Sequence, residues 1–309
     1  MKLNRRRFIA ISAAAIAVPG TVLADAPVLR WHGTAMGASA SLTVSGLDAD
    51  AFRTICDAAS GEIARLENIF SLYRPESALS RLNAAGRLES PPFDLVQLLS
   101  LAGSVHHATN GAFDPTVQPL WHALATGADA APARQLIGWD NVRVETGGIN
   151  FGRPGMAITL NGIAQGYATD RVAALLRSAG LTNVLVSVGE IVASGRKSPE
   201  QPWRVGISER EDGAPEESVL LEDMAIATSA PSGMMIGNHQ GHIINPASGL
   251  SAGLWRRISV INASAAIADG LSTAFCSMTG PQITAALSRF AGSRVIGAAS
   301  GGDRLELES

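Results

Sequence analysis

The sequence predicts an α+β fold in which mostly antiparallel strands pack against helices. The chain has 309 residues, of which 46% are hydrophobic and 17% are charged, so it can bury one large core or two closely packed ones. Segments with helical spacing of apolar residues are interspersed with short apolar runs bounded by glycine or proline, which is typical of strands. The sequence contains no repeat of fixed short period and no low-complexity tract.

The N-terminal half is predicted to contain a strand pair, three helices and a hairpin. Residues 29–44 form the strand pair around the turn-prone stretch 33–37. Apolar residues recur at helical spacing through residues 49–70, which predicts a long helix. The other predicted elements of this half are helices over 78–83 and 94–109, a β-hairpin over 139–151 that turns at Gly147 and Gly148, and a strand over 157–160.

The C-terminal half is predicted to begin with a loop over 161–166, a helix over 167–178 and a strand over 183–188. A strand, a glycine-containing loop and a helix in this order are typical of phosphate-binding units. The loop is neither a G-x-G-x-x-G sequence nor a P-loop, which excludes a Rossmann or Walker site. A helix is predicted around Asp269, and strands over 203–207, 218–228, 242–244, 255–261 and 294–296, the last of which closes the sheet.

Residues 1–24 have the composition of a cleaved export signal. Three arginines, Arg5 to Arg7, form a twin-arginine-like start, residues 9–18 are apolar, and residues 22–24 form a small-residue cleavage site. We therefore expect a mature chain over 25–309 that reaches the periplasm by the twin-arginine route, with a plain secretory signal as the alternative. No later stretch is apolar for about 18 residues, so we do not expect an integral membrane protein.

Charge and cysteine content argue against several classes of function. Loss of residues 1–24 removes four basic residues and no acidic one, which changes the formal net charge from −3 to −7. Such a chain offers no broad basic surface for nucleic acid. Cys56 and Cys276 show neither zinc-site spacing nor a C-x-x-C pair. Their sequence positions leave open whether they form a disulfide or remain separate core thiols.

Asp269 and Thr273 lie four residues apart in an apolar, helix-like stretch, and this spacing places both side chains on one helix face. A carboxylate among apolar side chains is costly unless it reaches water, a donor or a hard cation. The ordinary alternative is that Asp269 caps the helix and Thr273 bonds back to the preceding turn. The spacing alone favours this ordinary alternative.

Other polar or unusual side chains interrupt apolar segments at expected strand ends and loops, where binding sites are common. Each has an ordinary explanation when taken singly. Tyr73 fits a turn aromatic, Asp114 a turn former before proline, and His242 a core histidine. The whole set is Met36, Tyr73, Asp114, Thr159, Gln165, Asp170, Glu190, Ser229 and His242.

Seven sequence blocks, taken in their order, resemble the ApbE family of FAD:protein FMN transferases. The similarity runs from about Trp31 to about Gly280. Residues 160–166 (LNGIAQG) and the twin-arginine-like start are most similar to the NosX branch, which is associated with nitrous-oxide reductase maturation. The blocks are residues 33–37 (GTAMG), 70–77 (FSLYRPES), 111–117 (GAFDPTV), 162–170 (GIAQGYATD), 227–229 (ATS), 242–249 (HIINPASG) and 268–273 (ADGLST).

The resemblance implies an ApbE-like fold over residues 25–309, a single compact unit of two intertwined subdomains. It implies that FAD is the substrate and that Mg²⁺ is held by Asp269, Thr273 and the carbonyl of Gly162, with Ser272 in the same shell. Oxygen ligands suit Mg²⁺ better than zinc. His242 matches a histidine needed for activity, as a base or as a positioning group. The positions that match FAD contacts are Met36, Tyr73, Ala112, Phe113, Asp114, Thr159, Gln165 and Ile243.

The implied reaction is attack by a Ser or Thr hydroxyl of an acceptor flavoprotein on the FMN-side phosphorus of FAD, with release of AMP. In the NosX branch the implied acceptor is a membrane-anchored flavoprotein such as NosR. Two positions differ in charge from the family's usual residues. Thr159 stands where many members have Asp, and Gln165 where many have Lys or an acid. A non-catalytic FAD-binding accessory protein and an FAD pyrophosphatase therefore remain as alternatives.

Overall fold

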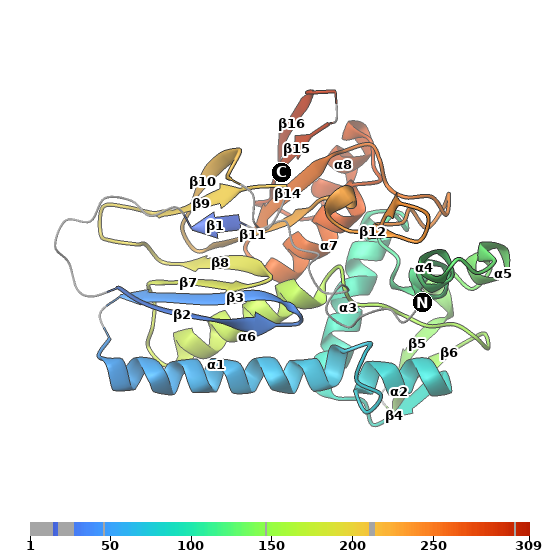
Figure 1. The fold of residues 1–309 in the computed structure, drawn as a ribbon, viewed down its shortest axis with the longest axis horizontal. Helices are drawn as coiled ribbons and strands as arrows, with labels where there is room; N and C mark the ends of the chain where they lie inside the picture. The colour runs from blue at the N-terminus through green and yellow to red at the C-terminus, as the bar shows by residue number, and fades with distance from the viewer. Residues whose placement is uncertain (1–14, 18–27, 46, 146, 210–213, 300) are drawn as a thin grey trace.

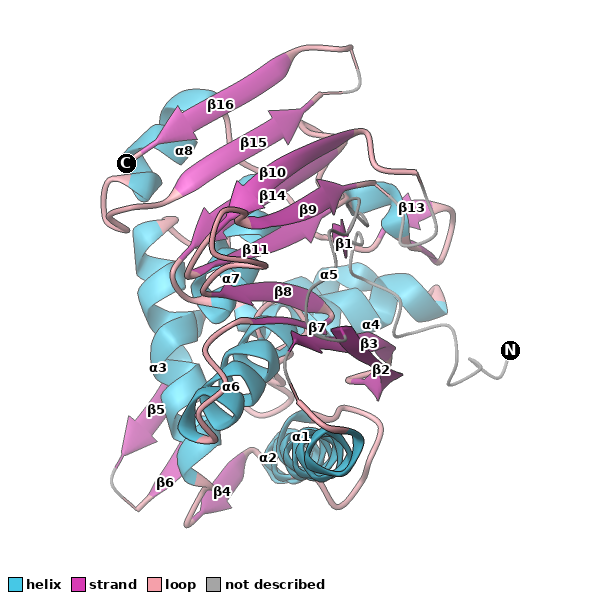
Figure 2. Ribbon diagram, turned by 90° about the vertical axis from the view of Figure 1, so that its left-hand side faces the viewer, coloured by secondary structure: helices cyan, strands magenta, loops and turns pink. Residues whose placement is uncertain are grey.

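Eight strands form the central sheet of the computed structural model, which describes residues 15–17, 28–45, 47–145, 147–209, 214–299 and 301–309. The strand order is β16-β15-β14-β11-β8-β7-β3-β2, and every neighbouring pair is antiparallel (Figure 2). The strands are β2 (Val28–Ala35), β3 (Ala38–Ser45), β7 (Val184–Val188), β8 (Glu190–Ser194), β11 (Met224–Ser229), β14 (Arg257–Asn262), β15 (Arg294–Ala298) and β16 (Arg304–Glu308).

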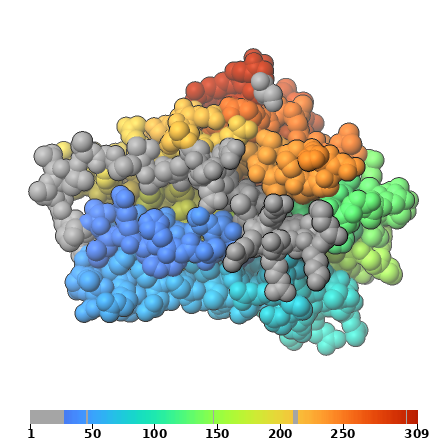
Figure 3. Space-filling model, viewed as in Figure 1, coloured from blue at the N-terminus to red at the C-terminus, as the bar shows by residue number. Residues whose placement is uncertain are grey.

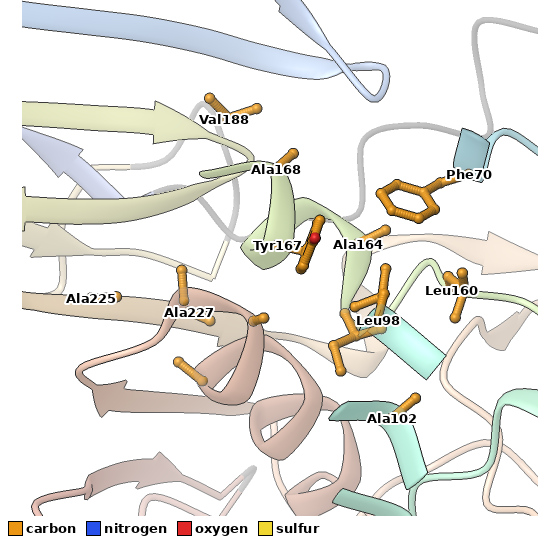
Figure 4. Close-up of a cluster of buried hydrophobic side chains, with 14 of the residues drawn as sticks. Phe70, Leu98, Ala102, Leu160, Ala164, Tyr167, Ala168, Val188, Ala225 and Ala227 are labelled. Carbon is orange, nitrogen blue, oxygen red and sulfur yellow. The ribbon is translucent and has the colours of Figure 1, made fainter. Parts of the chain in front are cut away.

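Helices cover one face of this sheet and enclose the main hydrophobic core (Figure 1). The long helix α1 (Ala49–Phe70) begins at Asp48, whose carboxylate accepts the first free backbone N–H groups. Its last residue, Phe70, meets the ring of Tyr167 edge to face, with ring centroids 5.6 Å apart. Tyr167 belongs to α6 (Ala164–Ser178), which packs against both α1 and α7 (Ala265–Phe275). The core close-up shows Tyr167 near Phe70 (Figure 4).

Helices α6 and α7 approach each other so closely at Gly166 that any residue larger than glycine would clash there. A Cβ atom on Gly166 would lie 2.2 Å from the carbonyl oxygen of Ala265. The helices also exchange hydrogen bonds. Asp170 of α6 accepts the backbone N–H groups of Ala265 at 2.8 Å and Ala266 at 3.0 Å, while Gly166 N–H donates to the carboxylate of Asp269 at 3.0 Å. The two helices are therefore joined through backbone groups of both.

A small sheet covers part of the other face of the central sheet. Its order is β1 (Ala15–Ala17), β9 (Trp203–Ile207) and β10 (Glu217–Leu221). Trp203 and Val219 of this layer pack with Leu185 and Ile261 of the central sheet in a second hydrophobic cluster. The sheet is thus sandwiched between a helical layer and a smaller β layer.

The remaining elements surround one end of the molecule. α3 (Phe93–Ala108) packs against α1 and α7. The loop that follows α3 leads through a short 3₁₀ turn (Pro115–Val117) into α4 (Gln118–Thr126). The other elements are α2 (Ala78–Ala85), α5 (Ala130–Arg134), α8 (Gly280–Leu287), the sheet of β4 (Arg87–Glu89), β6 (Gly148–Phe151) and β5 (Val142–Glu145), and the hairpin of β12 (Met235–Ile236) and β13 (Gln240–Gly241).

Much of the predicted order of elements is confirmed. The predicted bounds of α1 and β9 match to the residue, and β2 and β3 are joined by a turn at Met36 and Gly37. Helix α6 begins at Ala164 rather than at residue 167, because the carbonyl of Leu160 accepts the N–H groups of Ile163 and Ala164 and starts the helix earlier. The expected hairpin is present as β5 and β6, although residues 139–141 form a 3₁₀ turn.

Several strand predictions are wrong. Residues 157–160 form no strand, because the side chain of Asn83 takes both the N–H and the carbonyl of Ile158. Residues 218–228 are two strands separated by a turn in which Asp223 has φ +51°. Residues 242–244 form only one isolated bridge, between Ile244 and Ser251. The sheet does not close at 294–296, since β16 pairs with β15, and β8 was not predicted.

Other expectations concern the N terminus, the membrane and the cysteines. The predicted signal, residues 1–24, lies outside the described residues except for Ala15–Ala17. Within the described ranges no helix combines the length and the apolar character needed to cross a bilayer. Cys56 and Cys276 are both buried free thiols, so the disulfide alternative is wrong.

Candidate functional site

A cavity lies at one end of the central sheet, where β11 ends and β8 begins. The register that pairs Ile226 with Ile191 brings Glu190, at the start of β8, and Ser229, at the end of β11, to the same end of the central sheet. The cavity contains about 810 Å³ of empty space, part of it open to solvent. It is lined by Ala112, Phe113, Asp114, Pro115, Val117, Gln118, Trp121, Thr159, Asn161, Gly162, Gln165, Glu190, Ser229, His242, Ile243, Ile244, Pro246, Asp269 and Thr273.

Most of the predicted site residues meet in this cavity. The predicted metal ligands Gly162, Asp269 and Thr273 line it, as does His242. The predicted FAD contacts that line it are Ala112, Phe113, Asp114, Thr159, Gln165 and Ile243. Met36, Tyr73 and Ser272 are not among the lining residues.

Asp269 lies in the middle of α7 and does not cap it. The N-cap of α7 is Ser264, whose hydroxyl accepts the N–H of Ile267. Asp269 is 4% exposed, and its Oδ2 accepts the N–H of Gly166 at 3.0 Å. Burial raises the pKa of Asp269 to about 7, with a smaller contribution from the nearby Asp170, while the Gly166 hydrogen bond opposes the shift. The ordinary explanation of Asp269 as a helix cap is therefore wrong.

Thr273 does not bond back to the preceding turn in the way typical of a helical threonine. The carbonyl of Asp269, four residues earlier, accepts instead the hydroxyl of Ser272 at 3.0 Å. The hydroxyl of Thr273 lies 3.4 Å from that of Ser229 on β11. Thr273 also touches Gly162, where a Cβ atom would come within 2.9 Å of Thr273 Oγ1. The carboxylate, the hydroxyl and the Gly162 backbone therefore border one space.

His242 is buried at the opposite wall, in the segment that follows β13. Its Nδ1 lies 3.2 Å from the carbonyl of Met234, and its own carbonyl accepts the indole N–H of Trp121. Because a carbonyl can only accept, Nδ1 carries the proton, and Nε2 is an acceptor that has no hydrogen-bond partner among the described residues. Burial lowers the pKa of His242 to about 4, against the opposing effect of the carbonyls of Met234 and Pro231.

The His242 segment is braced by the helices that follow the 112–117 loop. Besides Trp121 of α4, Arg134 at the end of α5 donates to the carbonyl of Ala247. Figure 3 shows the orange surface of this segment beside the green surface of α4 and α5. The wall that carries His242 thus belongs to a different part of the chain from the α6–α7 wall.

Hydrogen bonds within the loop after α3, to α3 itself and to Thr159 fix the conformation of this loop. Asp114 accepts the N–H of Thr116 at 2.8 Å and its hydroxyl at 2.6 Å, which caps the 3₁₀ turn. His106 of α3 lies 2.9 Å from the carbonyl of Phe113 and 3.7 Å from the second carboxylate oxygen of Asp114. Thr159 joins the same wall, because its N–H donates to the carbonyl of Pro115 at 2.9 Å. Asp114 is therefore a turn former, as expected, and it also lines the cavity.

The lining of the cavity includes three acidic side chains but, among the described residues, neither lysine nor arginine. The three acids are Asp114, Glu190 and Asp269, and all of them are buried. Glu190 accepts the N–H of Thr228 at 3.2 Å. Gln165, at the first turn of α6, is buried and supplies an uncharged amide. An anionic ligand in this cavity would require added positive charge.

Met36, Glu67 and Arg74 form a separate group, which we call the Glu67 clamp, and Tyr73 precedes Arg74 in the chain. Glu67 of α1 accepts the N–H of Met36 at 2.8 Å through one oxygen and pairs with Arg74 through the other. Met36 has φ +48°, an uncommon conformation for a residue other than glycine. Tyr73 is 38% exposed, and its N–H donates to the hydroxyl of Ser71 at 3.1 Å. The register of Ala40 with Val188 puts the Met36 turn at the same end of the sheet as Glu190.

Glu190 and Ser229 line the cavity, although the sequence predicts them only as polar interruptions at strand ends and not as site residues. Trp121, Gln118 and Asn161 also line the cavity and were not singled out. Glu190 and Ser229 stand at the start and end of buried strands, and Ser229 also belongs to the family-like block 227–229; these were the signals that pointed to them.

Comparisons with known proteins agree with this architecture. The ApbE family model matches residues 36–296. The FAD:protein FMN transferase of Salmonella typhimurium is 27% identical over 277 residues, covering 81% of this chain and 79% of the relative. The enzyme of the same name from Vibrio cholerae serotype O1 is 31% identical over 225 residues, covering 66% and 67%.

Solved structures show the same fold. The flavin transferase ApbE from Vibrio cholerae aligns with a TM-score of 0.77 at 24% identity, over 92% of this chain and 98% of that one. The ApbE protein of Thermotoga maritima aligns with a TM-score of 0.80 at 23% identity, over 91% and 97%. The mixed helices and antiparallel sheets of a single compact chain are thus the ApbE fold, as predicted. The family model covers most of the sequence, and the chain belongs to the ApbE family, whose named relatives are transferases.

Proposed function

We propose that this protein transfers FMN from FAD to a Ser or Thr hydroxyl of an acceptor flavoprotein and releases AMP. The observation that supports this proposal most strongly is the convergence of Asp269, Thr273 and Gly162 on a cavity that His242 also lines. Relatives named FAD:protein FMN transferases supply the substrate class. The acidic lining of the cavity adds a specific requirement, because a pyrophosphate would be repelled there without a cation.

The donor set suits Mg²⁺. Asp269 offers a buried carboxylate, Thr273 a hydroxyl and Gly162 a backbone carbonyl, all of them oxygen donors. Among the described residues no group of three or more His, Cys, Asp or Glu side chains could hold a metal ion, so the proposed site depends on hydroxyl and carbonyl oxygens beside one carboxylate. A bound Mg²⁺ would neutralise the pyrophosphate oxygens and the AMP leaving group.

The chain's own residues would bind and orient the substrate. Phe113, Ala112 and Ile243 supply apolar surface for a ring system. Gln165 offers an uncharged amide that can donate to a phosphate oxygen without a full charge. Neutral His242 has a buried Nε2 with no hydrogen-bond partner among the described residues. It would act on the attacking hydroxyl, either by positioning it or by taking its proton as the new phosphorus–oxygen bond forms and the bond to AMP breaks.

A single experiment tests the activity. The chain lacking residues 1–24 is incubated with FAD, Mg²⁺ and a candidate acceptor domain, and the mass of the acceptor and free AMP are followed. Addition of FMN to the acceptor with matching AMP supports transfer. AMP and free FMN with an unmodified acceptor would instead support a pyrophosphatase, and tight FAD binding without product would support an accessory protein.

The acceptor and the location extend the proposal. The NosX-like block 160–166 and the twin-arginine-like start support a role in the periplasm, with a membrane-anchored flavoprotein such as NosR as acceptor. A NosR flavin domain and an unrelated flavinylated domain, compared as acceptors, test the partner. Secretion of a reporter fused to residues 1–24, with Arg5 and Arg6 replaced by lysine as the control, tests the route.

A further inference from the structure

Three hydroxyl groups form a connected set beside the α6–α7 wall. Ser229 Oγ on β11 lies 2.9 Å from Ser272 Oγ and 3.4 Å from Thr273 Oγ1, both on α7. Ser229 and Thr273 line the cavity, whereas Ser272 is fully buried and does not. The first distance is a normal hydroxyl hydrogen bond and the second is a long one.

The positions of the protons in this set follow from one fixed acceptor. Ser272 Oγ lies 3.0 Å from the carbonyl oxygen of Asp269, which has no proton to give, so Ser272 must donate there. Its only hydrogen is then used, and Ser229 must be the donor in the contact with Ser272. Ser229 is left with lone pairs alone toward Thr273, and Thr273 must therefore donate to Ser229.

This order of donors determines which side of Thr273 Oγ1 is free. A hydroxyl can ligate a cation only through a lone pair, and a proton that points at the cation would be repelled. Donation to Ser229 directs the Thr273 proton toward β11. Thr273 Oγ1 meanwhile lies beside Gly162, where a Cβ atom would approach it to 2.9 Å.

We propose that Ser229 is a positioning residue that accepts the proton of Thr273 and so presents the lone pairs of Thr273 Oγ1 to the cation site. The inference rests on the proposed function, since it concerns the same site. Ser272 orients Ser229 by accepting its hydrogen bond, and it donates its own proton to the carbonyl of Asp269. In this arrangement Ser272 does not ligate the cation itself. The three hydroxyls act as an oriented series that ends on a backbone carbonyl.

The competing explanation is that these hydroxyls only pack β11 against α7. A neighbouring pair offers a matched control for this explanation. Thr228 Oγ1 on β11 and Ser259 Oγ on β14 are buried and 2.9 Å apart, and neither residue lines the cavity. Removing the Ser259 hydroxyl loses a buried hydroxyl contact to β11 without altering the contacts among Ser229, Ser272 and Thr273.

The test measures binding of Mn²⁺, as a spectroscopic substitute for Mg²⁺, by the electron paramagnetic resonance of free Mn²⁺ with FAD present and no acceptor. Ser229→Ala should weaken Mn²⁺ binding about 10-fold, the size usual for groups that orient metal ligands. Ser259→Ala should leave Mn²⁺ binding unchanged. Circular dichroism and thermal melting verify that each variant is folded.

A double-mutant cycle separates positioning from packing. Thr273→Val removes the hydroxyl with little change of shape, and we expect Ser229→Ala to weaken binding no further in that background, because Ser229 acts through Thr273. Four results would each overturn the inference. They are additive losses of Mn²⁺ binding in the double variant, unchanged binding in Ser229→Ala, an equal loss of binding in Ser259→Ala, and failure of the unaltered protein to bind Mn²⁺. Mn²⁺ binding that follows the cycle without FMN transfer would overturn the proposed function alone.

Discussion

The cavity and the Glu67 clamp hold predicted site residues in different ways. The cavity is built from buried groups on rigid elements, α6, α7 and the end of β11, and its polar atoms are positioned by backbone and hydroxyl hydrogen bonds. The Glu67 clamp is a half-exposed ion pair that ties a turn and a loop to the end of α1. Chemistry that depends on placement within fractions of an ångström suits the first region, and contact with a large, variable part of a substrate suits the second.

Removal of the Asp269 carboxylate should have the largest effect. Asp269→Asn keeps the shape of the side chain but loses its charge, so we expect Mg²⁺-dependent transfer to fall on the order of 10³-fold, as for other losses of charge stabilisation at a reacting centre. The melting temperature should not fall, because burial already disfavours the charged form. Initial rates of acceptor labelling and thermal melts measure both. Activity equal to that of the unaltered protein would remove Asp269 from the site.

His242 should make stability depend on pH. Its pKa is about 4 in the folded chain and near 6.5 in the unfolded chain, so the unfolded state binds the proton first as the pH falls. The stabilisation is fully present above about pH 6.5 and is lost toward pH 4, a loss of about 3 kcal/mol in the free energy of unfolding. Urea unfolding between pH 4.5 and 7.5 measures it.

A His242→Gln variant is the control for this pH dependence. It should show a flatter pH profile of stability over that range, because glutamine does not titrate. An equally steep profile in the variant would assign the effect to other groups.

The close contact of α6 with α7 can be tested with two glycines. Gly166→Ala would place a methyl group 2.2 Å from a carbonyl oxygen, which should destabilise the protein by about 1–3 kcal/mol and weaken cation binding by moving α6 from α7. Gly61→Ala, at an exposed position of α1 with no neighbouring atom within 4 Å, should instead stabilise it by about 0.5–1 kcal/mol. Urea unfolding of both variants gives the comparison, and similar values for the two would contradict the packing argument.

The Glu67 clamp should show the smallest effect, and on binding rather than on turnover. Glu67→Gln loses the ion pair with Arg74 while keeping an acceptor for Met36, so we expect a loss of about 1 kcal/mol, roughly fivefold in KM for FAD, with kcat unchanged. Glu76→Gln, an exposed acid on the same loop, is the control and should change neither constant. A fall in kcat with constant KM would place the clamp at the reacting centre instead.

The sequence predicted elements best where local signals agreed with tertiary structure. The capped, amphipathic α1 and the apolar β9 are such cases. Prediction from the sequence failed where a side chain distant in the sequence determined the local structure. Asn83, for example, hydrogen-bonds the backbone of Ile158, and the predicted strand over 157–160 does not form. In the site, spacing identified Asp269 and Thr273 as a pair and the family resemblance identified His242. Ser229 could not be assigned, because its partners on α7 are brought to it only by folding.

The exchange of hydrogen bonds between α6 and α7 has a consequence for how the site opens. The amides of Gly166, Ala265 and Ala266 all donate to carboxylates of the opposite helix, so the two helices must separate before these three protons meet solvent. Their hydrogen-exchange rates therefore report one shared opening event, and a ligand that binds only the joined pair should slow all three by the same factor. The site would then behave as preorganised, with little ordering left to be done when substrate arrives.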